Sequence, residues 1–267
     1  DARREYQCQN CRAISVFVDG RVAARCDFCG SPAIVAHESL GDAITPQSLL
    51  PFKLSEGQVR DRIRAWYGGR WFAPNRLKTA ALTDTLKGVY LPYWTFDAHA
   101  NAHWQAEAGH YYTTTETYRD SNGNTQTRQV QHVRWEPASG SLQHFFDDDL
   151  VPGTVGLHAA LLRQIEPFPT TSDLVAYAPE YVRGWTVERY QVDLRRAANQ
   201  SQRQMDETLR DLCARRVPGD TYRNLMVNAA YQGRTFKHIL VPVWLIHYTY
   251  GAKTYQIVAN GYTGALA

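Results

Sequence analysis

The chain has 267 residues, 44% hydrophobic and 12% aromatic, enough to bury the core of one large domain or two modest ones. A net charge of +3 excludes binding to nucleic acid or an anionic membrane through overall charge alone. The longest apolar run, Ile239–Ile246, is far shorter than the roughly 20 residues of a membrane-spanning helix. No secretory signal is visible and the five cysteines do not form a secreted disulfide framework, so we expect a cytoplasmic protein.

Four cysteines near the N-terminus form two Cys-x-x-Cys pairs, Cys8 with Cys11 and Cys26 with Cys29. Two intervening residues let both thiolates of a pair reach one tetrahedral zinc ion. We therefore predict one structural Zn²⁺ bound by these four residues. Four thiolates leave no open coordination position, so we expect no hydrolytic chemistry there.

The segment between the two pairs reads as a hairpin. Ala13–Val18 is strand-like, Asp19-Gly20 is a two-residue turn signal, and Arg21–Arg25 is the returning strand. This predicts a zinc ribbon over residues 1–36, stabilised mainly by its metal. The alternatives are two disulfides or a redox Cys-x-x-Cys, although redox pairs lie at the start of a helix and neither pair here does.

The ribbon is also the most basic part of the chain, with aromatic residues between its arginines. This composition is that of a surface that binds single-stranded nucleic acid, but we favour the alternative, an ordinary solvated face above a small core. The residues concerned are Arg3, Arg4, Arg12, Arg21, Arg25, Tyr6, Phe17 and Phe28.

The first half after the ribbon predicts a helix and a long hairpin. Ser55 is an N-cap signal before apolar residues at helical spacing. From Phe96 to Ala108 every even position is apolar, which predicts a half-buried strand with one polar face. Tyr111–Tyr118 and Thr125–Trp135 flank an Asn-Gly turn signal and read as a long β-hairpin.

The second half predicts a long helix over about Asp193–Arg216, followed by strands over Lys237–Tyr250 and Lys253–Asn260. The helix places four apolar residues on one face, namely Met205, Leu209, Leu212 and Cys213. Cys213 is then a small buried hydrophobic residue and not a reactive thiol.

The two halves resemble one another. Lys87–Phe96 recurs as Lys237–Ile246, each copy with a central proline and tryptophan, although a match this short also arises by chance. We expect each proline at a sheet edge or bulge, because proline cannot donate to a ladder. The predicted fold class is α+β, a zinc ribbon followed by two related helix-plus-antiparallel-sheet units. The predicted domains are 1–36, 48–150 and 151–267.

Catalytic motifs are not evident. The sequence contains no Gly-x-x-x-x-Gly-Lys-Ser/Thr phosphate loop. Asp97, His99, His103 and Glu107 share one strand face, but residues four apart on a strand are about 13 Å apart, which is too far for one metal ion. Asp97 and His99, about 6.6 Å apart, could still share a partner from a neighbouring strand, which leaves an enzyme built on these two residues as a third alternative. Asp147–Asp149 reads as an exposed loop. We therefore predict a protein that is not an enzyme.

Several segments together resemble a family of bacterial zinc-ribbon proteins labelled TFIIB-type, primosomal protein N′ or superfamily II helicase. They are the four-cysteine ribbon, Leu50–Lys53, Trp71–Pro74, Gly88–Asp97, Lys237–Trp244 and Asn260–Gly264. The resemblance implies no catalytic residues, and the helicase label finds no ATP-binding loop here. Some members of this family look like membrane-associated partners of SPFH-type or phage-shock-type proteins. The resemblance therefore implies membrane association through a partner.

From the sequence we expect a cytoplasmic adaptor or scaffold that binds another protein, either in the cytoplasm or near a membrane. The alternative is a nucleic-acid-binding protein that uses the basic ribbon.

Overall fold

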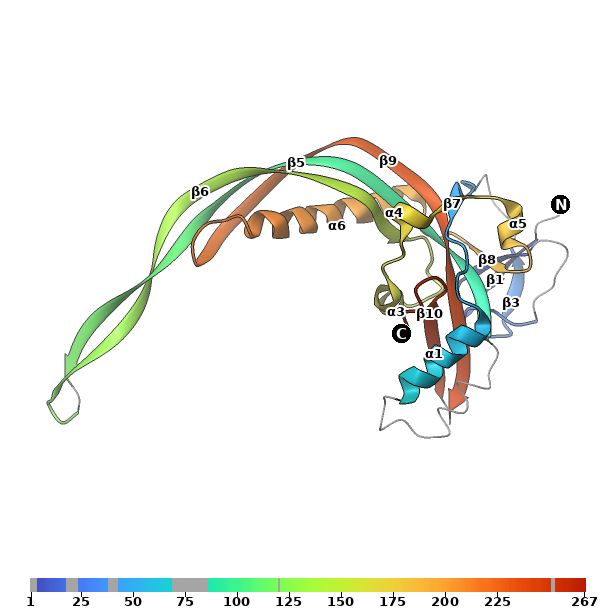
Figure 1. Cartoon of the computed structure of the whole chain (residues 1–267), viewed down its shortest axis with the longest axis horizontal. Coiled ribbons are helices and arrows are strands. Elements are labelled where there is room, and N and C mark those ends of the chain that lie inside the picture. Colours follow the sequence, from blue (N-terminus) through green and yellow to red (C-terminus); the bar gives the residue numbers. More distant parts are fainter. Residues whose placement is uncertain (1–3, 18–23, 38–42, 69–85, 120, 251–252) are drawn as a thin grey trace. The chain divides into compact units, whose positions relative to one another are not determined.

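A computed structural model describes residues 4–17, 24–37, 43–68, 86–119, 121–250 and 253–267 (Figure 1). The strands are β1 (Arg4–Cys8), β2 (Ile14–Phe17), β3 (Ile34–His37), β4 (Ser48–Leu49), β5 (Leu86–Arg119), β6 (Thr125–Pro152), β7 (Val175–Ala176), β8 (Thr186–Arg189), β9 (Thr221–Tyr250) and β10 (Lys253–Asn260). The helices are α1 (Glu56–Gly68), α3 (Ala159–Ile165), α4 (Thr170–Asp173), α5 (Pro179–Val182) and α6 (Leu194–Ala214).

The predicted α+β fold is wrong. Strand accounts for 52% and helix for 21% of the structure, and the strands form one mixed sheet of ten strands. Its order is β3-β1-β2-β8-β5-β9-β4-β7, with β6 also paired to β5 and β10 to β9. The chain is therefore mostly β, and the ribbon strands belong to the same sheet as the rest.

The prediction of two separate antiparallel-sheet units fails because the halves exchange strands. β4 precedes α1 but pairs in parallel with β9, with Ser48 beside Ile239. β8 precedes α6 but pairs in parallel with β5, with Val89 beside Thr186. Periodicity shows which residues are extended, but it does not show which strand each one will pair with.

Contacts divide the chain into two compact units, each made of several segments. Unit 1 comprises residues 1–96, 148–200 and 236–267, and unit 2 comprises residues 97–147 and 201–235. β5, β6, β9 and α6 each contribute residues to both units. The predicted boundaries at 1–36, 48–150 and 151–267 stay a prediction.

Pro92 in β5 and Pro242 in β9 lie in interior strands, where we had expected an edge or a bulge. Each lies just beyond the point where a neighbouring parallel strand stops pairing, so its missing N–H breaks no ladder there. The carbonyl oxygen of each proline also accepts a hydrogen bond from the backbone N–H of a glycine. The Gly153 N–H donates to Pro92 O at 2.8 Å, and the Gly261 N–H donates to Pro242 O at 2.9 Å.

The tryptophan two residues after each proline ties its strand to the chain entering a helix. The Trp94 Nε1–H donates to Val192 O at 2.8 Å, two residues before α6. The Trp244 Nε1–H donates to Leu54 O at 3.1 Å, two residues before α1. Since both partners come from the opposite half of the chain, these bonds join the halves into one structure.

The helix starts follow the predicted capping chemistry. In α1 the Ser55 hydroxyl accepts from the Gln58 N–H at 3.4 Å, and Gln58 Oε1 accepts from the Ser55 N–H at 2.9 Å, which forms a capping box. In α6 Asp193 Oδ1 accepts from the Arg196 N–H at 2.9 Å. Both predicted helices are confirmed in position.

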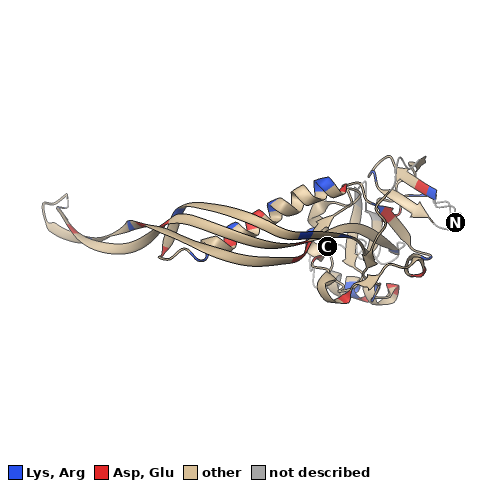
Figure 2. Ribbon diagram, turned by 90° about the horizontal axis from the view of Figure 1, so that it is seen from above, with Lys and Arg blue, Asp and Glu red and all other residues tan. Residues whose placement is uncertain are grey.

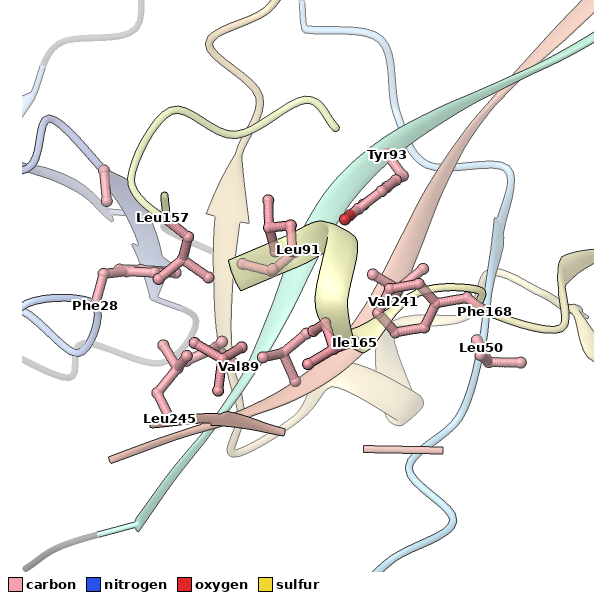
Figure 3. Close-up of a cluster of buried hydrophobic side chains, with 14 of the residues drawn as sticks. Phe28, Leu50, Val89, Leu91, Tyr93, Leu157, Ile165, Phe168, Val241 and Leu245 are labelled. Carbon is pink, nitrogen blue, oxygen red and sulfur yellow. The ribbon is translucent and has the colours of Figure 1, made fainter. Parts of the chain in front are cut away.

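The core of unit 1 packs between α3 and one face of the paired strands β5 and β9 (Figure 3). Its members are buried and almost entirely aliphatic or aromatic, including Phe28, Leu50, Val89, Leu91, Tyr93, Leu157, Ile165, Phe168, Val241 and Leu245. Phe28 belongs to the ribbon, so ribbon and sheet share one core.

In unit 2 the predicted alternation of β5 is confirmed. Six even positions are buried, namely Ala98, Ala100, Ala102, Trp104, Ala106 and Ala108. On α6, Met205, Leu209 and Cys213 are buried as predicted. The predicted hairpin is also confirmed, since β5 ends at Arg119, β6 starts at Thr125 and Gly123 takes a φ of 81°.

Two further expectations have other outcomes. Asp147–Asp149 lies within strand β6 and not in an exposed loop; Asp148 is buried and its Oδ1 lies 3.1 Å from Lys237 Nζ. The charge of Lys237 compensates the burial of this carboxylate. The predicted Asp19-Gly20 turn and the Trp71–Pro74 segment lie outside the described residues.

A buried histidine, His238, contacts residues from both halves of the sequence. The His238 ring lies 4.9 Å from the Trp94 ring and 5.2 Å from the Tyr190 ring. His238 Nδ1 lies 2.7 Å from Ile44 O, and the His238 N–H donates to Gln47 Oε1 at 3.1 Å. Burial lowers the pKa of His238 to about 4, so the neutral ring is the folded form near pH 7.

This histidine predicts a loss of stability in mild acid. Its folded pKa is below its ordinary value of 6.5, so protons bind preferentially to the unfolded chain as the pH falls from 6.5 towards 4. At pH 4.5 this costs about 2 kcal/mol of unfolding free energy relative to pH 7. The His238→Asn variant keeps a donor for Ile44 O and does not titrate. Between pH 7 and pH 4.5 its unfolding free energy should therefore fall by about 2 kcal/mol less than that of the unsubstituted chain. Equal losses in urea unfolding of both proteins would contradict this.

Candidate metal centre

The two Cys-x-x-Cys pairs fold into turns of the same geometry. The Arg12 N–H donates to Cys8 O at 2.9 Å, and the Cys8 N–H donates to Ala13 O at 3.0 Å. In the second pair the Gly30 N–H donates to Cys26 O at 2.9 Å, and the Cys26 N–H donates to Ser31 O at 2.8 Å.

Both turns end in a left-handed residue. Arg12 has a φ of 65° and Gly30 a φ of 73°. Glycine adopts this region without cost, and an arginine there is strained. The strain at Arg12 is tolerated because the two bonds of its turn orient Cys8 and Cys11 towards the other pair.

The four thiols converge on one point. All four sulfurs lie within 4.8 Å of one another. Cys8 Sγ is 3.6 Å from Cys29 Sγ, and Cys11 Sγ is 3.6 Å from Cys26 Sγ. A tetrahedral ion with four bonds of about 2.3 Å places its sulfurs about 3.8 Å apart, whereas a disulfide needs about 2.05 Å. The geometry therefore fits a metal centre, and the disulfide alternative does not describe this structure.

The electrostatics of the cluster already favour one thiolate. The hydrogen bond shared with Cys11, together with the N–H of Phe28, lowers the pKa of Cys26 to about 6. The same shared bond and burial raise the pKa of Cys11. Burial also raises the pKa of Cys29, whose sulfur accepts a hydrogen bond from Asn10 Nδ2 at 3.6 Å. A divalent cation would offset the repulsion between thiolates held this close.

The loop between Cys26 and Cys29 is bound to the sheet of unit 1 by both of its middle residues. Asp27 accepts from the Thr186 hydroxyl at 2.5 Å, and Lys87 Nζ lies 3.8 Å from its other oxygen. Phe28 is fully buried, and its carbonyl accepts from Gln256 Nε2 at 2.7 Å. The cysteine spacing in the sequence gave no signal for these partners, because they lie more than 50 residues away along the chain.

The ribbon strands continue this attachment. β1 pairs antiparallel with β2 and with β3, and β2 pairs antiparallel with β8. Arg189 of β8 forms an ion pair with Glu5 of β1 at 2.8 Å. Loss of the metal would therefore disturb the edge of the sheet as well as the ribbon.

A buried carboxyl lies beside β2. Glu188 pairs in register with Ser15 and is 1% exposed. Neither of its oxygens has a hydrogen bond of good geometry, although the Thr154 hydroxyl and the Gln191 amide lie close enough to lower its pKa. Burial outweighs them and raises the pKa of Glu188 to about 8, so the folded chain holds this group protonated near pH 7.

On the polar face of β5, Asp97, His99 and Glu107 each contact a different residue. Asp97 accepts from the Thr235 hydroxyl at 2.7 Å, and the His99 ring lies 4.5 Å from the Phe145 ring. Glu107 accepts from Arg223 at 2.8 and 3.1 Å, and this bond lowers the pKa of Glu107. The structure therefore does not bring these residues together, and it supports no catalytic assignment for them.

Comparisons with known proteins give one distant relative. No protein-family model matches the chain, and no solved structure matches it. The chain is similar to the uncharacterized protein YdjG of Bacillus subtilis (strain 168), with 22% identity over 253 residues, or 87% of this chain. The chain spans 65% of that relative's length. The resemblance to TFIIB-type zinc-ribbon proteins stays a prediction.

In the described part of the chain, no helix combines the length and the apolar character needed to cross a membrane.

The cluster predicts that one ligand substitution removes the metal. Cys29→Ser should leave less than one bound metal ion per chain and lower the unfolding temperature by several degrees, because three thiolates hold the ion less tightly. Cys213→Ala is the control, since this buried cysteine of α6 lies outside the cluster. It should keep the metal and lose only about 1 kcal/mol to a small cavity. Equal metal content in both variants, measured by elemental analysis, would refute the assignment.

Proposed function

We propose that this chain is a non-catalytic scaffold protein in which one structural Zn²⁺ holds the ribbon on the sheet and a β-hairpin arm binds a partner protein. Zinc is the metal that a closed set of four thiolates prefers, and such a site has no position for substrate. The metal therefore acts through folding, and binding falls to another part of the chain.

The observation that carries the proposal is the arm, which we define as residues 110–119 of β5 and 125–135 of β6. Almost all of its side chains are exposed or half-buried. Tyr111, Tyr112 and Tyr118 are 45 to 50% exposed. A two-stranded ribbon is marginally stable alone, and exposed tyrosines are enriched where proteins bind other proteins.

One side of the arm forms an ordered surface, which we call the tyrosine face. It consists of Tyr112, Thr114, Glu116, Tyr118, Arg128 and His132. Tyr112 stacks on His132 with ring centroids 5.3 Å apart, and the His132 ring accepts or donates a 2.8 Å bond to Thr114. Arg128 pairs with Glu116 at 2.9 Å. Arg128 also lies over the Tyr118 ring, 5.7 Å from its centroid. These contacts hold the Tyr112 and Tyr118 rings in place, which lowers the entropy lost when a partner binds.

The arm predicts that partner binding depends on its tyrosines. The full chain, immobilised, should retain a protein from cell extract that the double variant Tyr112→Ala, Tyr118→Ala does not, since each ring contributes an aromatic anchor. Tyr181→Ala is the matched control, because Tyr181 on α5 is also 45% exposed but lies outside the arm. Retained proteins that are the same for all three would exclude the tyrosine face as the binding surface.

Nucleic-acid binding is a second candidate, supported by the ribbon's charges. Arg4, Arg12 and Arg25 are exposed, whereas the nearby acids Glu5 and Asp27 are paired with Arg189 and Lys87. This leaves a net positive surface on the described part of the ribbon.

This candidate predicts affinity for single-stranded DNA or RNA that falls with salt. Neutralising Arg12 and Arg25 to Gln should weaken binding and reduce the slope of log affinity against log salt by about 1 to 2 units. Fluorescence anisotropy with labelled oligonucleotides measures both. Absent binding, or binding that does not respond to salt, would remove this function.

A further inference from the structure

The backbone of the arm exposes one strand edge. The Asp220 N–H donates to Gly109 O at 2.8 Å, and the Tyr111 N–H donates to Asp220 Oδ2 at 2.8 Å. Gly109 and Tyr111 thus direct their backbone groups towards the side of β5 where β9 pairs. Because these directions alternate along a strand, the N–H and C=O groups of Thr113, Thr115 and Thr117 point to the same side.

That side is open beyond Tyr111 in the described part of the chain. β9 is the strand that pairs with β5 there, and it begins at Thr221. In Figure 1 β5 and β6 continue past the start of β9 as a two-stranded ribbon. We call the run Tyr111–Arg119 on this side the outer edge of the arm.

The outer edge carries two charged residues, Glu116 and Arg119, and Glu116 is paired with Arg128 of β6; it lacks the proline and the lysine with which sheets commonly protect an edge. β6 carries Pro137, and β9 has a positive φ of 54° at Asn224, devices that interrupt pairing. Tyr111–Tyr118 contains four threonines, three tyrosines and one glutamate, with no proline or lysine. Figure 2 shows few charged residues along these strands. β-branched and aromatic residues of this kind favour strand pairing.

We propose that the outer edge pairs antiparallel with the outer edge of a second copy of this chain, centred on Thr115. The two arms would then form a four-stranded sheet about a two-fold axis. A sheet of four strands is stable where a two-stranded ribbon is marginal. The inference goes beyond the proposed function, because it rests on the backbone groups of the edge and its occupant is a second copy of this chain and not a different protein.

The charges and rings of the edge fit this register. Thr113 lies opposite Thr117 of the second copy, and Tyr111 lies opposite Arg119 of the second copy, a cation–π pair. On the tyrosine face Tyr112 lies opposite Tyr118 of the second copy, an aromatic cross-strand pair. Glu116 lies opposite Thr114 of the second copy. A register centred on Glu116 would instead oppose two carboxylates, which is unfavourable.

Proline scanning tests the edge separately from the arm. Thr115→Pro removes an N–H that points outward, so it should raise the dimer dissociation constant about tenfold or more while β6 stays paired. Thr115→Ala keeps the N–H and should change it by less than about threefold. Sedimentation equilibrium of the full chain measures the constants. A monomer at every accessible concentration, or equal constants for the two variants, would overturn the proposal.

Cysteine cross-linking tests the register. In this register the two Thr115 residues lie directly opposite one another with their Cα atoms about 5.5 Å apart, which is within the range of a disulfide. Thr115→Cys should therefore form an interchain disulfide under mild oxidation, whereas Thr113→Cys, which faces Thr117 of the second copy, should not. Mass spectrometry identifies the linked peptide. Equal cross-linking at both positions, or none at Thr115→Cys, would overturn the register. An unsubstituted chain that dimerises but retains no protein from cell extract would count against the proposed function alone.

Discussion

Strands β5 and β9 lie side by side in the sheet, and the other strands are joined to them either directly (β4, β6, β8 and β10) or through one of these strands. Each carries a proline just beyond the point where its parallel neighbour stops pairing. Each also carries a tryptophan whose indole N–H donates to the segment that leads into a helix. Because the strand before each helix pairs with the central strand of the other half, neither half can complete its sheet without the other. The ribbon, through β2 on β8, and the core of unit 1 depend on this pairing.

The metal centre extends the same arrangement. Its loop packs Phe28 into the core and bonds through Asp27 to β8, so the four thiols are held against the sheet of unit 1. A free ribbon of this size has too little core to fold without metal. In this chain the ribbon gains shared core and strand pairing, while the sheet gains a covered edge. The cluster therefore links the N-terminal residues to the rest of unit 1.

The sequence predicted local features well and long-range pairing poorly. The cysteine spacing identified the cluster, the period-two pattern of Phe96–Ala108 identified a half-buried strand, and the Asn-Gly signal identified the hairpin. These depend on neighbours within a few residues. The fold class was wrong because parallel pairing of β4 with β9 joins segments nearly 200 residues apart, and no local pattern encodes it. Asp148 was misread for the same reason, since its partner Lys237 is distant in sequence.

The interpretation that the two halves form one cooperative sheet is tested most directly by native-state hydrogen exchange. Amides of residues 86–96 and 237–247 should exchange through the same opening, with equal free energies and equal dependence on denaturant, because each set is paired to strands of the other half. A large difference between the two sets, with one exchanging while the other stays protected, would contradict this account. It would show two independently stable halves, as the sequence pattern alone had suggested.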